Sequence, residues 1–398
     1  MMRFLSILLK GLSSLVLLFL LLVLVTGISP VYSFRAPQPF SGPDIFNPYQ
    51  ALDSCQGWKR ALFHTHTRVD GPWPVNECPH TAAYTDSVLR SLGYDIVTFS
   101  NHNEITQHPY DSTLQVNVYE QGYSPYKFHK LVFGSPAVKH WDPLLPVLAS
   151  QQQFELDRLG ADADLIQINH PYRTVGLPKS HLEKLSGYQL MELDTHVNTE
   201  NEYWDWALSA GHYSFGLAND DLHHPERHEL TGIRCNFICT PSGRYEDLLP
   251  ALRSGCYYAM RVPDYGNGDW AVKREKNHQL PFVEAIGVEG DTLYLKLSAP
   301  ADSIRVNGQN HTTLALLEQT DRIAYNLAPD GPYARFTAFF PDGAVLYTNP
   351  FARYDASVQD SPYNPAPQPV NVPLTLLWNL LLSVLIAGTL WLLIRLWR

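Results

Sequence analysis

Positive charge is scarce in this sequence, and it forms no cluster in the central part of the chain. The chain has 29 lysines and arginines against 39 aspartates and glutamates, which gives a formal net charge of -10. Proteins that bind nucleic acid need clustered lysine and arginine to neutralise phosphates. The composition therefore argues against a nucleic-acid partner, and the acidic balance suits a domain that gathers cations.

Cysteine is also infrequent, and no internal repeat occurs. The chain has five cysteines, and none has the spacing of a zinc finger. Cys55 and Cys78 flank the first histidine motif and are candidates for a disulfide, which would suit an oxidising compartment. Cys235 and Cys239 are expected to face the same side of a strand. Because the number is odd, at least one thiol stays unpaired or pairs between chains.

Long hydrophobic runs are confined to the two ends of the chain. Residues 12–28 and 374–394 are almost unbroken apolar runs, and the second is long enough to cross a bilayer as a helix. Basic residues lie on the outer side of each run, namely Arg3, Lys10, Arg395 and Arg398. The positive-inside rule then predicts that both termini are cytoplasmic and that the middle is extracytoplasmic, either periplasmic or on the cell surface.

A cleaved signal peptide is the alternative for residues 1–28, because Val31-Tyr32-Ser33 is a tolerable cleavage site. The length of the run and the lack of an A-x-A motif favour an uncleaved anchor. Both interpretations place the middle of the chain outside the cytoplasm.

Proline-rich segments separate the ends from the middle. We expect residues 29–54 and 353–373 to be stiff, extended spacers between the membrane and the domain. Residues 55–270 alternate short apolar runs with amphipathic helical patterns. Residues 280–352 instead show short strands with turn dipeptides such as Asn307-Gly308, so we expect a small antiparallel module similar to a β-sandwich.

The alternating pattern of residues 55–270 predicts an α/β fold with a largely parallel sheet. The strand candidates are residues 60–63, 96–100, 115–119, 128–133, 165–168, 189–193 and 214–218. About seven such strands predict a distorted β/α barrel that is closed or nearly closed.

Histidines and carboxylates occur at the ends of these strand candidates. They are His64 and His66 after the first, His102 after the second, Glu120 after the third, His129 within the fourth, His170 at the end of the fifth, and Asp221 and His223 after the seventh. Side chains at the carboxyl ends of parallel barrel strands converge on one face. We therefore expect these residues to lie together.

This set of residue types is typical of a metal centre. Imidazole suits zinc, iron and manganese, and a carboxylate can bridge two ions. His64 and His66, two residues apart on an extended segment, can reach the same ion. A single histidine at a strand end is more often an ordinary polar residue, but an ordered set of this size exceeds what one ion needs. We expect two to three divalent ions, of zinc, manganese or iron.

The ordered motifs resemble those of the PHP (polymerase and histidinol phosphatase) family over residues 58–262. The resemblance implies a distorted seven-stranded β/α barrel with up to three divalent metals, and the later β module looks like an extension found in many bacterial members. It also implies which residues bind which ion: His64, His66, Glu120 and Asp221 the first, Glu120, His129 and His170 the second, and His102, His223 and Asp70 the third.

Three positions depart from the family pattern. Asn101 occupies a position that is usually aspartate, and the loop from His66 to Asp70 is one residue shorter than usual. Asp220 precedes Asp221, and only Asp221 has the DxH spacing.

These features predict an extracytoplasmic, metal-dependent phosphoesterase in which a metal-bound hydroxide attacks a phosphate ester. Arg173 is a candidate ligand for a phosphate oxygen, although a surface salt bridge is an equally good interpretation. The expected substrate is a small-molecule or lipid-linked phosphate ester. A metal-dependent amide or ester hydrolase, and a non-catalytic metal-containing sensor or scaffold, remain as alternatives.

Overall fold

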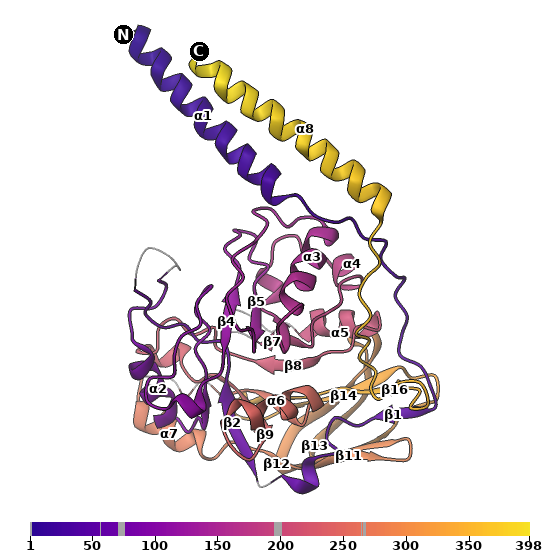
Figure 1. Cartoon of the computed structure of the whole chain (residues 1–398). Helices are drawn as coiled ribbons and strands as arrows, with labels where there is room; N and C mark the ends of the chain where they lie inside the picture. Colours follow the sequence, from indigo (N-terminus) through magenta and orange to yellow (C-terminus); the bar gives the residue numbers. More distant parts are fainter. Residues whose placement is uncertain (1, 56, 71–75, 195–200, 264, 266–267) are drawn as a thin grey trace.

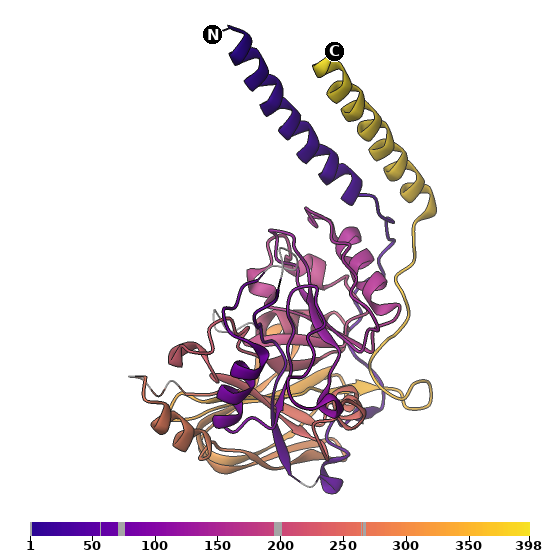
Figure 2. The same cartoon turned by 60° about the vertical axis from the view of Figure 1, so that its left-hand side comes forward.

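The computed structural model describes residues 2–55, 57–70, 76–194, 201–263, 265 and 268–398 (Figure 1). They form a mixed α/β domain with one long apolar helix at each end of the chain. The two terminal helices lie side by side in all three overall views and leave the domain at the end formed by α3 and α4 (Figures 1 and 2).

The helices of the described residues are α1 (Met2–Thr26), α2 (Ala82–Ser91), α3 (Ala149–Gly160), α4 (Lys179–Leu182), α5 (Asn201–Ser209), α6 (Tyr245–Ser254), α7 (Trp270–Asn277) and α8 (Val372–Trp397). Local sequence sets several of their ends. The side chain of Thr81 accepts a hydrogen bond from Tyr84 N and caps α2, and α6 ends at Gly255, whose φ of 80° favours glycine.

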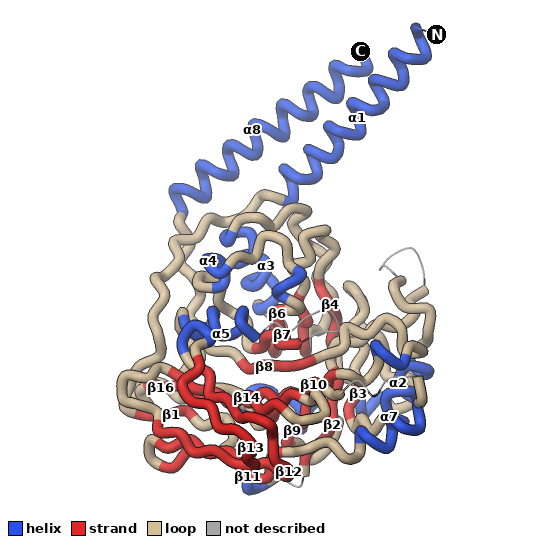
Figure 3. Tube along the Cα trace, turned by 180° about the vertical axis from the view of Figure 1, so that it is seen from behind, coloured by secondary structure: helices blue, strands red, loops and turns tan. Residues whose placement is uncertain are grey.

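One sheet of the described residues has strands in the order β1 (Asp44–Phe46), β16 (Phe351–Tyr354), β14 (Tyr333–Phe339), β15 (Val345–Thr348), β10 (Tyr257–Arg261), β9 (Arg234–Cys239), β2 (Trp58–Leu62) and β3 (Ile96–Val97). The long β12 (Thr292–Asn307) joins it by pairing with β14, and β11 (Val283–Glu289) and β13 (Thr313–Asn326) pair with β12. Figure 3 shows these last strands at the end of the domain away from the terminal helices.

The second sheet has the order β4 (Val118–Gln121), β5 (Lys130–Phe133), β6 (Leu165–Ile168), β7 (Leu190–Asp194) and β8 (Phe215–Ala218) within the described residues. Strands β6, β7 and β8 are parallel, whereas β5 is antiparallel to both β4 and β6. The sequence pattern predicted a largely parallel sheet, but two of the four pairings in this sheet are antiparallel. One buried core packs β4–β8 against α3, α5 and α6. A second buried core contains side chains from β2, β9 and β10 together with side chains from β11, β12 and β14.

The described strands do not form the closed seven-stranded barrel that we expected. The two sheets are separate ladders, and isolated bridges connect them at two places, Thr65 with Leu222 and His102 with Glu120. Both bridges involve the segments that carry the predicted metal ligands. Strands β2, β3 and β8 end at Leu62, Val97 and Ala218, so the ligand-bearing residues that follow them lie in loops.

The antiparallel strands expected between residues 280 and 352 are present, and they continue a sheet that also contains β2, β9 and β10. The connection is the antiparallel pairing of β15 with β10, for example between Met260 and Leu346. The domain limits of the sequence analysis remain a prediction, because strand pairing alone does not establish which parts fold independently.

The proline-rich segments run along the domain and against each other. Tyr32 forms an antiparallel bridge with Val370, and Ser33 N donates to Pro369 O at 2.8 Å. Farther along, β1 lies in the first of these segments and pairs with β16. These segments therefore pair with each other and with the domain, and fasten both terminal helices to it.

The disulfide of the described residues joins Cys55 to Cys239, with Cα atoms 5.5 Å apart. The predicted Cys55–Cys78 pairing is wrong, and Cys78 is a buried free thiol. The antiparallel pairing of β2 with β9 places Trp58 opposite Cys239 and so brings the segment before β2 to the end of β9. A long-range strand register that the sequence does not reveal thus determines the pairing.

Candidate metal centre

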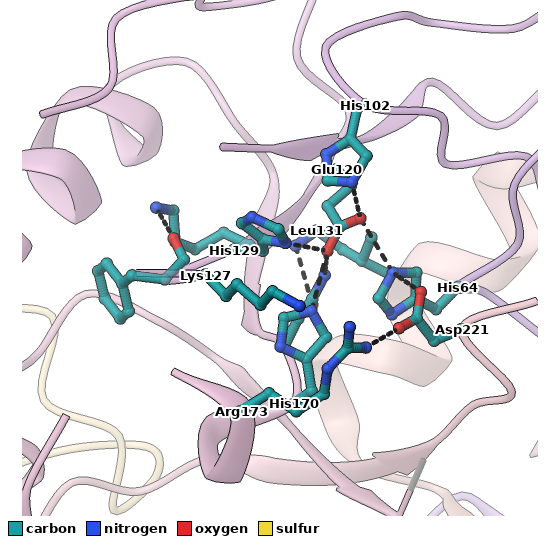
Figure 4. A network of polar contacts seen from close by, with 12 residues as sticks. His64, His102, Glu120, Lys127, His129, Leu131, His170, Arg173 and Asp221 are labelled. Atoms are coloured by element: carbon teal, nitrogen blue, oxygen red, sulfur yellow. Dashed lines mark hydrogen bonds and ion pairs between the residues drawn. The ribbon is translucent and has the colours of Figure 1, made fainter. Parts of the chain in front are cut away.

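The predicted ligands other than Asp70 come together at one rim between the two sheets, and Figure 4 shows His64, His102, Glu120, His129, His170 and Asp221 there. Glu120 lies within β4 and His129 directly precedes β5, so both are displaced slightly from their predicted places relative to the strands. Because β5 is antiparallel to β4 and β6, its amino end meets the carboxyl ends of those two strands. His129 therefore reaches the rim before its strand, whereas His170 reaches it after β6.

Glu120 is the centre of the cluster and is only 1% exposed. Within the described residues, its carboxylate oxygens lie 3.1 to 3.3 Å from ring nitrogens of His64, His66, His102, His129 and His170. Three of these contacts fall on Oε2 and two on Oε1. A carboxylate with histidines grouped around each of its oxygens has the arrangement expected of a ligand that bridges two cations.

The first group of donor atoms consists of Nε2 of His64 and His66, Oε2 of Glu120 and Oδ1 of Asp221. The distances between histidine nitrogens and carboxylate oxygens in this group are 3.1 to 3.3 Å. Four tetrahedral ligands at about 2.1 Å from a zinc ion lie about 3.4 Å from one another. The two Nε2 atoms are buried and lie within 3.3 Å of both carboxylates without a hydrogen-bond partner, which is expected of atoms that share one ion.

The second group lies on the other oxygen of Glu120. Nδ1 of His129 is 3.1 Å and Nε2 of His170 is 3.3 Å from Oε1 of Glu120. His129 fits here because Gly122 has no side chain, and a Cβ at that position would lie 2.6 Å from Cδ2 of His129. His102 adjoins this group as well, since its ring packs edge-on against His129 at a centroid distance of 4.8 Å.

The third group contains a residue that the sequence analysis missed. Oε2 of Glu77 lies 3.1 Å from Nε2 of His102 and 3.0 Å from Nε2 of His223. Asp70, predicted for this place, is exposed and belongs to none of the candidate metal groups in the described part of the chain. Glu77 lies in a loop with no periodic pattern. Its position after the His64-x-His66 motif was the one feature of the sequence that could have indicated it as a ligand.

A second layer of buried polar residues orients the donor atoms. Oε1 of Glu192 lies 3.0 Å from Nδ1 of His64, and its Oε2 accepts from His170 N at 2.8 Å. Asn169 Nδ2 donates to Oε1 of Glu120 at 2.9 Å. A histidine whose Nδ1–H is held by a carboxylate presents Nε2 to the metal as a lone-pair donor. The acids in the buried strand Met191-Glu192-Leu193-Asp194 were a signal that the sequence analysis did not use.

Asn101 and Asp220 have supporting roles. Asn101 Oδ1 accepts from Thr67 N at 2.7 Å, and the side chain therefore holds the loop after His66. Asp220 belongs to none of the candidate metal groups in the described residues and accepts backbone hydrogen bonds from residues 232–234. Burial raises the pKa of Asp220 to about 6, against the opposing effect of Arg234.

Other histidines near strand ends are not part of the cluster. His224 is exposed and pairs with Glu226 at 3.2 Å. His228 is buried in a short helical turn that packs against Trp270. His196 lies outside the described residues.

Burial and neighbouring charges shift the pKa values of several groups in the cluster. Burial alone would raise the pKa of Glu120, yet His102, His64 and His129 hold it well below its usual range. Burial lowers the pKa of His129 to about 4, whereas Asp221 and Glu77 overcome burial at His223 and raise its pKa to about 9. Ionised carboxylates that face imidazole nitrogens favour a divalent cation, which replaces the protons held by such histidines.

Two of the predicted ligands have a strained backbone. His170 has φ 24° and Asp221 has φ 50°, both in the left-handed region that non-glycine residues rarely adopt. His170 N is held there by Glu192. The surrounding contacts therefore fix two donor atoms in positions that the free chain would seldom occupy.

A pocket of about 350 Å³ opens onto the third group. Its lining includes Glu77, Asp221, His223 and Arg173. Nη1 of Arg173 lies 2.5 Å from Oδ2 of Asp221, and the side chain is 24% exposed. The pocket thus combines donor atoms for cations with one guanidinium group that faces solvent.

The described donor atoms fit divalent metal ions, because nitrogen and oxygen donors converge at ligand-to-ligand distances and two of them, Nε2 of His64 and of His66, have no hydrogen-bond partner. His64, His66, His102, Glu120, His129, His170, Asp221 and His223 all lie in the cluster, together with Glu77. Asp70 lies outside it.

No family model matches the chain, and no curated protein matches its sequence. One solved structure is similar, the two-domain protein from Bacteroides vulgatus described as containing a predicted PHP-like metal-dependent phosphoesterase. It is 14% identical, with a TM-score of 0.38, and the match covers 79% of this chain and 99% of that chain.

Proposed function

We propose that this protein is a metal-dependent phosphoesterase anchored in a membrane, with its α/β domain on the extracytoplasmic side. The observation that carries the proposal is the buried carboxylate of Glu120, which has histidine nitrogens within 3.3 Å of each oxygen. Two to three ions of zinc, manganese or iron would be held by the three groups of donor atoms. Bound divalent ions supply Lewis acidity and lower the pKa of a water molecule.

A phosphate ester is the substrate class that best suits the pocket. Within the lining, Arg173 is the cation beside the donor atoms, and its guanidinium group has the geometry to hold two phosphate oxygens. Its contact with Asp221 also fixes the guanidinium at the mouth of the site, so an anionic group can enter without reorganising it. An uncharged amide or carboxylic ester would form no ion pair with this guanidinium group.

Three observations support the location. Helices α1 and α8 contain stretches, Phe4–Thr26 and Val372–Trp397, that are long and apolar enough to cross a membrane. Basic residues lie on the outer side of both. The Cys55–Cys239 disulfide is typical of an oxidising compartment, and it lies in the α/β domain.

The test is to purify the full chain in detergent, measure its metal content, and assay phosphomonoesters, phosphodiesters, carboxylic esters and amides. We expect more than one ion per chain and release of phosphate or of a phosphomonoester. Hydrolysis only of amides or carboxylic esters would replace the reaction class. A metal-loaded chain that hydrolyses none of them would favour the sensor or scaffold alternative.

A further inference from the structure

Three apolar side chains remain exposed at the end of the domain where α1 and α8 leave it. Val147, Leu148 and Val175 are 42%, 44% and 57% exposed, and we call them the apolar rim. Exposed apolar residues that are scattered singly need no explanation, but these three belong to neighbouring segments.

The two segments of the apolar rim are held together by the side chain of Gln152. Its Nε2 donates to Pro146 O at 2.9 Å and to Gly176 O at 3.0 Å. Each acceptor directly adjoins a rim residue in the sequence. A Cβ built on Gly176 would lie 3.8 Å from Cα of Val147, which confirms that the two segments are in contact.

The apolar rim adjoins the end of a membrane helix. Thr26 is the last residue of α1, and its Oγ1 accepts a hydrogen bond from Leu144 N at 3.2 Å. Tyr32 N donates to Ser150 Oγ at 3.1 Å, so the chain leaving α1 follows the start of α3. The segment 144–150 therefore lies at the level where α1 leaves the bilayer in the topology proposed above.

The apolar rim also continues into the metal centre. Val175 follows Arg173 by two residues, and its N–H donates to Tyr126 O at 2.8 Å. The neighbouring Thr174 Oγ1 donates to Lys127 O at 2.8 Å. Both segments that carry a ligand of the second group, His129 and His170, thus extend directly to the rim.

Positive charge lies between the apolar rim and the donor atoms. Lys127 is exposed, and Arg173 is partly exposed at the mouth of the pocket. Figure 4 draws Lys127, His170 and Arg173 on the side of Glu120 away from His102. An apolar surface followed by two cations and a metal centre matches, in that order, the acyl chains and the phosphate of an anionic lipid.

We propose that the apolar rim rests on the bilayer that holds α1 and α8, and that the metal centre hydrolyses a phosphate ester of a membrane lipid. This inference rests on the phosphoesterase function and the topology proposed above. In the reaction the oxygen of water bonds to phosphorus and the ester P–O bond breaks. One proton of the water passes to the leaving alkoxide to give the alcohol, and the other leaves with the phosphate product. No oxidant or further reactant is needed.

The contact with the bilayer is tested first, without any assay of activity. The full chain carrying Val175→Cys is labelled with a fluorophore in nanodiscs that contain doxyl-labelled phospholipid, and the labelled unsubstituted chain is the background. Val272→Cys on α7 is the matched control, because Val272 is 38% exposed and α7 lies far from the terminal helices (Figure 1). We expect quenching at position 175 and none at 272. Equal fluorescence with and without doxyl lipid at 175 would overturn the bilayer contact.

The substrate class is tested with nanodiscs that contain phosphatidic acid or phosphatidylglycerol, against glycerol 3-phosphate and glycerophosphoglycerol in solution. We expect Val147→Ser with Val175→Ser to reduce lipid hydrolysis about tenfold and to leave hydrolysis of the soluble esters unchanged. Val272→Ser with Leu316→Ser, two exposed positions outside the rim, should change neither.

The outcomes separate this inference from the function on which it rests. Hydrolysis of the soluble esters alone, or equal losses on lipid and soluble esters, would overturn the lipid substrate and leave the phosphoesterase standing. No hydrolysis of any ester by a metal-loaded chain would overturn the phosphoesterase itself.

Discussion

Two buried clusters of this protein contain a carboxylate and histidine, but they balance the negative charge differently. In the first, histidine nitrogens surround Glu120, and within the described residues no lysine or arginine pairs with it. In the second, Asp205 on α5 pairs with Arg335 on β14 through Nε at 2.9 Å and Nη2 at 2.5 Å. His311 also contacts Asp205, and both members of the ion pair are fully buried.

The difference shows which cluster needs a metal. Burial would raise the pKa of Asp205, but Arg335 lowers it, so the protein itself supplies the balancing charge. Glu120 and Asp221 face mainly imidazoles, which supply positive charge only while they hold a proton, as the raised pKa of His223 allows, and Arg173 pairs with Asp221 alone. A divalent cation can take the place of those protons. An isolated buried charge is too costly to persist. The cluster around Glu120 is therefore the one in which an external cation completes the charge balance.

The largest expected effect is that of Glu120→Gln. The amide removes the bridging charge from two groups of donor atoms, so metal content should fall and hydrolysis should drop by about a thousandfold or more, equivalent to several kcal/mol of transition-state stabilisation. Metal analysis and phosphate release measure the two effects. The far-UV circular dichroism should be unchanged, since the volume is nearly conserved. Normal activity in this variant would show that Glu120 does not bridge metals.

Asp205→Asn should have the opposite pattern. It leaves the buried guanidinium of Arg335 uncompensated, which should lower the free energy of unfolding by about 3–5 kcal/mol. Chemical denaturation measures this change. Metal content and activity of the folded variant should equal those of the unsubstituted chain, because the ion pair lies outside the donor groups. Loss of metal from this variant at a temperature where it is folded would mean that the two clusters are coupled.

The sequence predicted most of the first cluster because its residues follow a simple rule. Histidines and acids at the ends of successive strands converge, and His64, His102, His170 and Asp221 fulfil this. Glu77 could not be found in the same way, since it lies in an irregular loop and its partners come from residues 102 and 223. The Asp205–Arg335 pair was missed because its members are 130 residues apart and neither lies in a motif.

The fold was predictable to a similar extent. Local periodicity indicated the strands and helices, but the direction of β5 and the pairing of β10 with β15 depend on contacts distant in sequence. Strand direction cannot be derived from alternation of apolar residues, because a strand has the same pattern when it is reversed. The open arrangement of two sheets and the Cys55–Cys239 disulfide follow from these distant pairings.

A smaller effect is expected at the third group of donor atoms, where Glu77→Gln and Asp70→Asn form a matched pair. Glu77 contacts His102 and His223, so its amide should lower metal content by about one ion per chain and leave the ion of the first group in place. Asp70 is exposed and outside the cluster, so its amide should lower nothing. Metal analysis of both variants decides between them. Loss of an ion only in Asp70→Asn would restore the ligand implied by the family resemblance.

The smallest expected effect is that of Asp220→Asn, which tests the register of the motif around Asp221. Asp220 Oδ1 accepts from Ile233 N at 3.2 Å and from Arg234 N at 2.8 Å, and Oδ2 accepts from Gly232 N at 2.6 Å. An asparagine has one acceptor oxygen, so at least one backbone N–H would face an NH₂ group. The free energy of unfolding should fall by about 1–3 kcal/mol. Since Asp220 holds the backbone of residues 232–234 and belongs to none of the candidate metal groups in the described part of the chain, metal content should be unchanged, and activity should fall far less than in Glu120→Gln. Losses of metal in Asp220→Asn equal to those in Asp221→Asn would mean that the two aspartates share one role, and that neither the backbone contacts nor the DxH spacing distinguishes them.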